Sequence, residues 1–554
     1  MKLWGAPILS AALLELPFPI AGPMPPWRSI FAWFGLVPLL WALLTPATVN
    51  CKRPFRRAFL LAYLCGVLWY MGNCYWIRDT MLHYGDMPTG APTLLLIAFS
   101  LVLGLYFGLF GLGLMLVRRA TGKNQHALMG APFVWVALDL AAARITSVPW
   151  DQLGYSQVDR GIADQLAPWT GVYGISFFIV MANTAVIAAI FDFLSRRGKP
   201  VPAIGFMPAL VLALFAFAIY GSGRSPESSS SMTAVLIQPN LDVGGDNDWS
   251  SPEDWQHHMV WLQKLASEQC KTYIAGIPQT GAPNAESTCP PNPRHPDLVV
   301  WPEAPALSFM ETDLRFQAGI ASLAKSEQAP IIVGGIGTDY SQDQQQQLDY
   351  NSAMVFAPDG HRVGRYDKIH LVPFGEYIPF QQYLTFAHKL TGKVSSFSRG
   401  TERSTFRLNG HRYGVFICYE AVFADEVRHF AQLGAEVLVN ISDDGWYGDT
   451  SAPWQHLNMV RMRAIENRRW LLRATNNGVT AAIDPYGRVR QSIPRHQVDS
   501  LPAQYGFRDD VTFYSAHGDI FAWLCVFASG AILLWALKKT IRDRVEAASR
   551  AEPS

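Results

Sequence analysis

The feature that most constrains the fold of this 554-residue chain is a series of long apolar runs, most of them within residues 1–221. Each run has about the length of a helix that crosses a bilayer, for which roughly 17–25 residues are needed. The expected spans are residues 5–21, 29–46, 58–77, 93–117, 127–146, 171–194, 203–221 and, near the C-terminus, 518–537. Only 16% of the residues are charged, against about 25% in ordinary soluble domains. The sequence therefore predicts a polytopic α-helical membrane domain of about eight spans, joined to an extramembrane domain.

Clusters of Lys and Arg indicate how these spans are oriented. They lie in alternate loops and after the last span: Lys52, Arg53, Arg56 and Arg57; Arg118, Arg119 and Lys123; Arg196, Arg197 and Lys199; Lys538, Lys539, Arg542 and Arg544. Basic loops tend to stay on the cytoplasmic side of a membrane. We therefore expect both termini in the cytoplasm and the segment between the last two spans outside, which is the periplasm in a bacterium with two membranes.

The loop 147–170 is unusual because Trp150 and Tyr155 stand among polar residues. Irregular backbone at membrane depth is tolerated only next to protein or water. The loop is therefore either an ordinary connection with interfacial aromatic residues or a re-entrant segment that lines a lipid site. The sequence leaves both interpretations open.

The extramembrane part begins at residue 232, where short β-rich runs start to alternate with helical segments. Strands are expected at 233–238, 298–301, 331–334, 352–356, 413–418, 437–441, 470–475 and 480–483, and helices at 252–268, 312–327, 421–433 and 455–468. The expected divisions are a membrane domain with seven spans (1–221), a Ser-rich linker (222–231), an extramembrane domain (232–513) with a surface insertion (269–296), the last span (518–537) and a cytoplasmic tail (538–554). The alternation predicts a layered α/β fold for the domain outside the membrane.

The stretch 414–420 reads Gly-Val-Phe-Ile-Cys-Tyr-Glu and predicts a buried strand that stops at a thiol, Cys418. A cysteine at a sharp strand-to-helix turn is held out of the sheet beside backbone N–H groups, where a nucleophile belongs. The alternative is a buried core cysteine, which behaves as a small hydrophobic residue. The rest of the sequence favours the nucleophile.

Two further stretches supply a carboxylate and an amine. Glu303 follows a buried run, with prolines on both sides, and Lys368 begins an apolar segment. A thiol is mostly protonated at neutral pH, so a nearby base can accept its proton as it attacks. A fixed ammonium can then stabilise the oxyanion, together with the backbone N–H that follows the cysteine. Taken singly, such a Glu usually ends a strand and such a Lys usually lies on a solvated face.

Other polar residues carry less information. The sequence shows no His/Cys cluster that suggests a metal, and it implies no cofactor. We expect His370 and His456 to be hydrogen-bonded structural residues. Four arginines of one expected helix, Arg461, Arg463, Arg468 and Arg469, either form a solvated face, which is the commoner case, or contact lipid phosphate.

The order Glu, Lys, Cys in these contexts resembles the carbon-nitrogen hydrolase (nitrilase) superfamily, over about residues 232–500. With spans on both sides of that region, the chain as a whole is similar to the apolipoprotein N-acyltransferase family of bacterial inner membranes. The stretches 371–379, 440–448 and 474–478 support this closer match. The resemblance implies a nitrilase-like α-β-β-α sandwich in the periplasm, carried by a multi-pass protein of the cell inner membrane.

The resemblance also implies roles for single residues. Glu303 would be the general base, Lys368 the oxyanion stabiliser and Cys418 the nucleophile. Glu376 would orient Lys368 or the attacking amine, and Tyr419 would supply an oxyanion N–H. Supporting positions would be Glu420 and Asn351, and substrate-binding positions Trp446, Tyr447, Asp443, Phe374 and Tyr377. The family usually has Asn-Asp where this chain has Asp443-Asp444, which leaves the role of Asp443 open.

By resemblance, the reaction is a two-step acyl transfer, the last step of bacterial lipoprotein maturation. The Cys418 thiolate would attack an acyl ester of a phospholipid, usually phosphatidylethanolamine, and form a thioester. The α-amine of the diacylglyceryl-cysteine of an apolipoprotein would then take the acyl chain. A net charge of +1 gives no case for nucleic acid. The rivals are a membrane-anchored nitrilase or amidase that hydrolyses an amide or ester, and a receptor or transport component without enzymatic activity.

Overall fold

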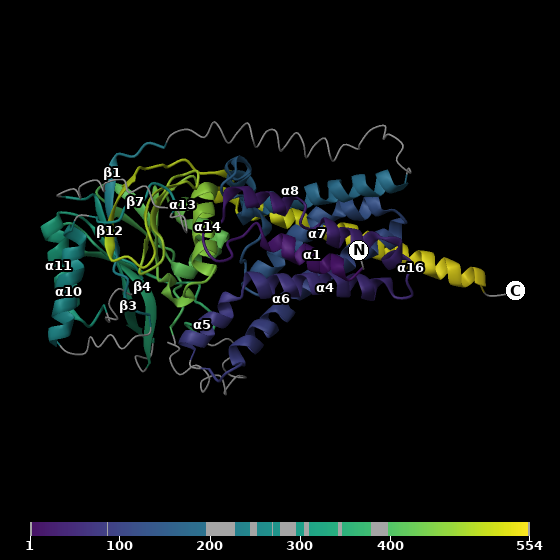
Figure 1. Cartoon of the computed structure of the whole chain (residues 1–554). Coiled ribbons are helices and arrows are strands. Elements are labelled where there is room, and N and C mark those ends of the chain that lie inside the picture. Colours follow the sequence, from purple (N-terminus) through teal and green to yellow (C-terminus); the bar gives the residue numbers. More distant parts are fainter. Residues whose placement is uncertain are drawn as a thin grey trace.

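The structure is a computed structural model that describes residues 3–85, 87–195, 228–243, 252–268, 270–277, 295–303, 310–341, 346–377 and 397–551. The expected span at 203–221 and most of the expected linker and insertion lie outside these residues. Figure 1 shows a bundle of helices with a β-rich domain at one end, and helix α14 (Ala452–Asn467) where the two meet. The C-terminus lies at the end of the bundle that is distant from the β-rich domain (Figure 1).

In the part of the chain that the structure describes, fewer helices are long and apolar enough to span a membrane than the sequence predicts. The main helices of the bundle are α1 (Gly5–Glu15), α2 (Val37–Leu44), α4 (Pro54–Asn73), α5 (Trp76–Tyr84), α6 (Ala91–Thr121), α7 (Asn124–Ile145), α8 (Gly161–Ser195) and α16 (Ile520–Ala551). Within the described residues, five helices are long and apolar enough to cross a membrane, or six if α4 and α5, bent by 47°, form one span. The count of about eight is therefore not confirmed. Helix α1 has 11 residues, and a helix of that length spans roughly half the thickness of the hydrocarbon core of a bilayer.

Small residues allow the helices of the bundle to approach closely. A Cβ added at Gly111 of α6 would lie 2.6 Å from the carbonyl oxygen of Ala58 on α4, and one at Gly104 would lie 2.7 Å from Val67. Helices in a membrane associate through such small-residue contacts because lipid provides no hydrophobic driving force between them. The glycines of α6 thus set its packing against α4.

The extramembrane domain contains two six-stranded sheets. The first has the order β12-β1-β2-β3-β4-β5 and the second β11-β10-β9-β8-β7-β6. The strands are β1 (Met232–Gln238), β2 (Leu298–Val300), β3 (Ile331–Tyr340), β4 (Gln347–Phe356), β5 (Arg362–Asp367), β6 (Thr405–Leu408), β7 (His411–Ile417), β8 (Val437–Ser442), β9 (Trp470–Thr475), β10 (Thr480–Ile483), β11 (Val489–Ile493) and β12 (Asp499–Tyr505). The central strands β1, β2 and β3 are parallel, as are β7, β8 and β9.

The two sheets pack face to face between two layers of helices. Helices α10 (Pro252–Ser267) and α11 (Leu314–Glu327) cover the first sheet, with Phe316 and Met259 packed on Val299 and Trp301. Strand β1 contacts β9, and β4 contacts β7, across the interior. Helices α13 (Ala424–Gln432) and α14 cover the outer face of the second sheet. The predicted α-β-β-α sandwich is thus observed.

The eight strands expected from the sequence are all present, whereas β5, β6, β11 and β12 were not predicted. These four strands are the outer strands of the two sheets. Edge strands commonly carry charged side chains that discourage pairing with other molecules, as β5 does with the sequence Arg-Val-Gly-Arg-Tyr-Asp. Such strands lack the apolar run by which the central strands were identified.

The four arginines do not form the solvated face that was predicted: Arg461, Arg463 and Arg469 are buried, and Arg468 is partly buried. Every residue of α14 is buried, because the helix lies between the second sheet and helix α8 of the bundle. Arg463 contacts Tyr155 Oη at 2.9 Å and Glu466 at 3.0 Å, and Arg461 pairs with Asp159. Buried charges require such partners. The partners come partly from the bundle, so these arginines join the two domains.

The expected loop 147–170 ends at residue 160, directly before α8, and the loop residues 147–160 belong to the same junction. Trp150 donates a hydrogen bond to Gln455 of α14 at 2.9 Å, and the carbonyl of Ser147 accepts one from Tyr419 at 3.1 Å. Its 3₁₀ helix η2 (Leu153–Gln157) is buried throughout. The loop therefore serves as the surface on which the extramembrane domain docks.

Candidate active site

Strand β7 ends at Ile417, and Cys418 begins the short 3₁₀ helix η3 (Cys418–Val422), as the strand-to-helix prediction requires. Cys418 has φ of +48°, in the left-handed region that residues other than glycine rarely adopt. Strained conformations of this kind gather at functional sites and need support from their surroundings. Cys418 is buried.

Glu420 supplies part of that support. Its buried carboxylate accepts hydrogen bonds from the N–H of Ile417 at 2.7 Å, from Tyr366 Oη at 2.8 Å and from the N–H of Ile369 at 2.6 Å. Burial raises its pKa to about 7, although these donors oppose the rise. Glu420 thus ties the Cys418 turn to the segment that follows Lys368.

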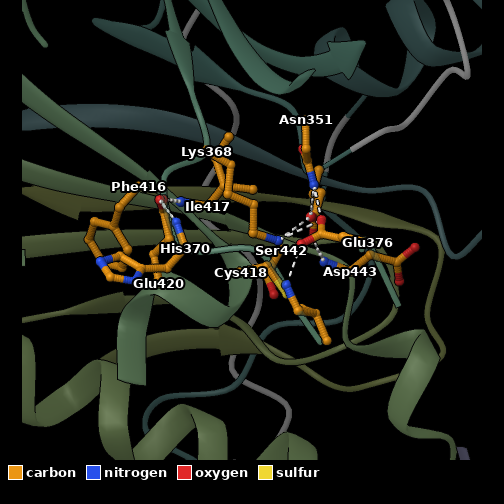
Figure 2. A network of polar contacts seen from close by, with 12 residues as sticks. Asn351, Lys368, His370, Glu376, Phe416, Ile417, Cys418, Glu420, Ser442 and Asp443 are labelled. Carbon is orange, nitrogen blue, oxygen red and sulfur yellow. Dashed lines mark hydrogen bonds and ion pairs between the residues drawn. The ribbon is translucent and has the colours of Figure 1, made fainter. Parts of the chain in front are cut away.

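Four side chains form a cluster near Cys418: Glu303, Asn351 and Lys368 are buried and Glu376 is partly buried; Figure 2 labels Asn351, Lys368, Glu376 and Cys418. Lys368 Nζ lies 2.9 Å from Glu376 Oε1 and 3.2 Å from Glu303 Oε1. Asn351 Nδ2 donates to the same two oxygens, each at 2.6 Å. The two carboxylates are therefore held together by one ammonium and one amide.

The first sheet brings these residues together. Glu303 follows β2, and Asn351 lies in β4, which is separated from β2 only by β3. Lys368 directly follows β5, and its N–H donates to the carbonyl of Asn351 at 2.8 Å. The first sheet thus fixes the backbone of Asn351 and of the residue before Lys368, whereas Glu376 lies in a turn that follows β5.

The second carboxylate oxygen of each glutamate is also fixed by the backbone. Glu303 Oε2 accepts from the N–H of Asp443 at 2.8 Å, and Glu376 Oε2 from the N–H of Val372 at 2.8 Å. Both carboxylates therefore have a single orientation in the site.

The charges determine the resting protonation states. Burial opposes charge on Lys368, yet Glu303 and Glu376 raise its pKa well above the ordinary value. Burial and the nearby Glu303 raise the pKa of Cys418, and Lys368 offsets only part of this rise. Cys418 therefore rests as a thiol, and a base must take its proton during attack.

Three of the aromatic residues singled out from the sequence face the bundle. Tyr419 bonds to Ser147, as described above. The ring of Trp446, which is 44% exposed, lies 5.3 Å from the ring of Tyr84 in α5. Tyr447 is buried 5.2 Å from Trp76. These bundle partners were missed because they lie 272 or more positions away in the chain, a separation that local sequence patterns do not connect.

The remaining candidates support the cluster from nearby turns. Phe374 and Tyr377 lie in the turn that carries Glu376, and the N–H of Phe374 donates to the carbonyl of Tyr377 at 2.8 Å. The Asp443 carboxylate accepts from the N–H of Gly445 at 2.9 Å and thereby begins the next 3₁₀ turn. Burial and the adjacent Glu303 raise the pKa of Asp443 to about 7.

The two histidines are hydrogen-bonded, as expected. His370 Nε2 lies 3.0 Å from Glu426, and His456 contacts the carbonyl oxygen of Cys418 at 3.0 Å. No pattern in the sequence indicates that His456 adjoins the nucleophile turn. Within the described ranges, no group of three or more His, Cys, Asp or Glu side chains is arranged to hold a metal ion.

Comparisons with known proteins agree with this architecture. The family model for the apolipoprotein N-acyltransferase N-terminal domain matches residues 10–185, and that for carbon-nitrogen hydrolase matches residues 237–497. An apolipoprotein N-acyltransferase of Geobacter metallireducens is 33% identical over 96% of this chain and 95% of its own length. One of Photobacterium profundum is 29% identical over 90% of this chain and 88% of its own.

Among solved structures, the chain is similar to an amidase of the nitrilase superfamily from Nesterenkonia, with 16% identity, a TM-score of 0.35, and coverage of 54% of this chain and 98% of that one. The family assignment rests on the sequence relatives, because the match to the Geobacter protein extends over nearly the full length of both chains. This chain belongs to the apolipoprotein N-acyltransferase family.

Proposed function

We propose that this acyltransferase moves a fatty acyl chain from a phospholipid, phosphatidylethanolamine, onto the α-amine of the diacylglyceryl-cysteine of an apolipoprotein, through a thioester on Cys418. The observation that carries the proposal is the cluster in which the buried Lys368 contacts both Glu303 and Glu376. It combines a base, a fixed cation and a thiol at the face of the domain that meets the bundle.

In the first step, Glu303 accepts the proton of the Cys418 thiol as the sulfur attacks the ester carbonyl carbon. The carbonyl oxygen becomes an oxyanion, which Lys368 and the N–H of Tyr419 stabilise. The intermediate collapses by breaking the bond to the glycerol oxygen. That oxygen takes the proton back from Glu303, and lysophospholipid leaves.

In the second step, the α-amine of the acceptor attacks the thioester carbon and gives a proton to Glu303. The second oxyanion collapses by breaking the C–S bond, and the Cys418 sulfur recovers the proton. Glu376 and Asn351 take no part in bond changes. Their hydrogen bonds fix the ammonium of Lys368 at the place where negative charge develops.

The proposed arrangement in the cell has both termini in the cytoplasm and the catalytic domain, residues 232–513, in the periplasm of an inner-membrane protein. The basic clusters in alternate loops support this orientation. The junction supports a site at the bilayer surface, because Tyr419 and Tyr447 contact residues of the bundle. Both substrates are lipids, and neither has to leave the membrane surface to reach such a site.

The test is an intact-mass measurement on the detergent-purified protein incubated with phosphatidylethanolamine and no acceptor, beside Cys418→Ala. We expect an acyl-sized mass increase on the parent alone, mapped to Cys418, and its discharge by a diacylglyceryl-cysteine peptide with formation of N-acyl product. Release of free fatty acid without N-acyl product would instead favour the hydrolase. A folded protein that gains no acyl mass from any phospholipid would refute the proposal.

A further inference from the structure

The carbonyl group of Cys418 meets the side chain of a fully buried histidine. His456 of α14 places Nε2 3.0 Å from that carbonyl oxygen. A carbonyl oxygen can only accept a hydrogen bond, so Nε2 carries the proton and donates it. The other ring nitrogen, Nδ1, lies 3.0 Å from Asp444 Oδ1. The histidine is therefore held between a carboxylate and the backbone of the nucleophile.

Asp444 is itself fixed in place. Arg473 donates to Asp444 Oδ2 at 2.6 Å, and Ser442 Oγ donates to Oδ1 at 2.9 Å. Burial opposes charge on Asp444, yet Arg473 and His456 keep its pKa well below the usual range. Nδ1 of the ring thus lies 3.0 Å from Asp444 Oδ1 and 3.3 Å from a guanidinium nitrogen of Arg473, and these two contacts orient the ring so that Nε2 points at Cys418.

A bond to the Cys418 carbonyl has a consequence at the next residue. The peptide group is planar and trans, so its C=O and N–H point in opposite directions. The carbonyl of Cys418 and the N–H of Tyr419 belong to one such plane. Fixing the oxygen on His456 therefore also fixes the direction of the Tyr419 N–H, the donor assigned above to the oxyanion.

The turn needs this restraint because Cys418 adopts a left-handed φ of +48°. Hydrogen bonds also fix the backbone of the two residues before Cys418. Asn440 Nδ2 donates to the carbonyl of Phe416 at 3.3 Å, and the N–H of Ile417 donates to Glu420 at 2.7 Å. These two bonds hold the strand end; Figure 2 labels Ile417 and Glu420. The bond from His456 acts on the peptide plane that contains the oxyanion donor.

We propose that His456, held by Asp444, is a positioning residue that aims the Tyr419 N–H at the oxyanion of the acyl-transfer intermediate. It acts through the backbone and not as a base, because its protonated nitrogen is engaged by the Cys418 carbonyl. The inference rests on the proposed function, since it assumes acyl transfer at Cys418.

The test compares two substitutions, each of which places an amide N–H near one of the two ring nitrogens of the imidazole. His456→Gln places an amide N–H near the position of Nε2, whereas His456→Asn places it near Nδ1 and leaves the Cys418 carbonyl without its donor. Two reactions of Cys418 are timed by intact mass. Acylation by phosphatidylethanolamine forms an oxyanion. Alkylation by iodoacetamide displaces iodide at a saturated carbon and forms none, so it reports only the reactivity of the thiol.

For His456→Asn we expect acylation to fall by about 100-fold, the effect of losing one oxyanion donor, with alkylation within about threefold of the parent. For His456→Gln we expect the rates of acylation and of alkylation to stay within about tenfold of those of the parent, because the hydrogen-bond donor is kept. The matched control is His429→Asn on α13, where the ring bonds only to the carbonyl of Asp425 at 2.6 Å among the described residues. It should change neither rate.

A His456→Asn variant that is acylated at the rate of the parent would overturn the proposal. A variant that loses acylation and alkylation to the same extent would also overturn it. So would a His456→Gln variant that is no faster than His456→Asn. If His456→Asn does not fold, as judged by thermal unfolding, His456→Gln decides, and a folded but inactive His456→Gln refutes the proposal. A parent that alkylates at Cys418 but never acylates refutes the acyl-transfer function instead, so the two failures are distinguishable.

Discussion

Lys368→Arg tests whether the site needs a compact ammonium or merely a positive charge. Lys368 is 1% exposed, and its Nζ lies 2.9 and 3.2 Å from two carboxylate oxygens. Arginine keeps the charge and can still pair with both glutamates. Its planar guanidinium is larger, however, and it cannot place one nitrogen at the point that Nζ occupies.

The expected loss follows from that displacement. Removing one oxyanion donor costs about 100- to 1,000-fold in rate, or about 2.7–4 kcal/mol of transition-state stabilisation. Fitting the larger side chain into a closed site costs a further 1–3 kcal/mol of folding stability, roughly. We therefore expect acylation of Cys418 to fall by at least about 100-fold, in a protein that remains folded but melts at a lower temperature.

The assay is the rate of Cys418 acylation by intact mass, beside thermal unfolding in detergent. The control is Lys264→Arg, the same substitution at a lysine whose side chain is 68% exposed and 3.4 Å from Glu268. It should alter neither quantity, because exposed pairs contribute about 0–1 kcal/mol. Acylation of Lys368→Arg within tenfold of the parent would refute the role assigned to the ammonium.

Asn351→Asp should lower acylation by about 100-fold or more, because it replaces the amide that donates to Glu303 with a third carboxylate; the intact-mass rate measures this. Asp443→Asn should change how stability depends on pH. The folded pKa of Asp443 is about 7, above its usual 3.8, so between these values the folded state alone binds the proton and stability falls as pH rises. The variant lacks this pH dependence. Its stability relative to the parent, measured by thermal unfolding, should therefore increase from pH 5 to pH 8. Glu466→Gln should destabilise the protein by about 3–5 kcal/mol, because it breaks a buried ion pair, whereas the exposed Glu546→Gln should not.

Clear outcomes would contradict each expectation. An Asn351→Asp variant with parental acylation would show that the amide is dispensable. A stability difference between Asp443→Asn and the parent that stays constant with pH would show that this carboxyl does not titrate as inferred. Equal melting temperatures for Glu466→Gln and Glu546→Gln would show that the pair of Glu466 with Arg463, 3.0 Å apart, adds nothing to the junction.

The sequence was sufficient to find the centre of the candidate site. Glu303 and Cys418 each follow an apolar run that forms a central strand, β2 in the first sheet and β7 in the second, and these two sheets pack face to face. Lys368 follows a strand that was not predicted, but its position before an apolar segment and the family resemblance identified it. The structure brings Glu303, Lys368, Glu376 and Asn351 into direct contact. Their roles in the reaction remain predictions.

The junction between the domains could not be predicted in the same way. A basic helix normally turns its charges to water, and the sequence of α14 contains no sign of the partners that bury Arg461 and Arg463. Those partners, Asp159 and Tyr155, stand in a loop about 300 positions earlier. Pairings over such separations follow from how two domains dock, which local patterns of hydrophobicity and charge do not encode.

Helix α14 joins the two halves of the molecule at the nucleophile. Gln455 accepts a hydrogen bond from Trp150 of the docking loop and donates to the carbonyl of Asn73 in α4 at 3.1 Å. The next residue, His456, donates to the carbonyl of Cys418. Contact with the bundle and support of the nucleophile turn are thus one residue apart on the same helix. Because a buried helix moves as a unit, docking on the bundle and the geometry at Cys418 are physically coupled, which suits an enzyme whose substrates arrive through the membrane.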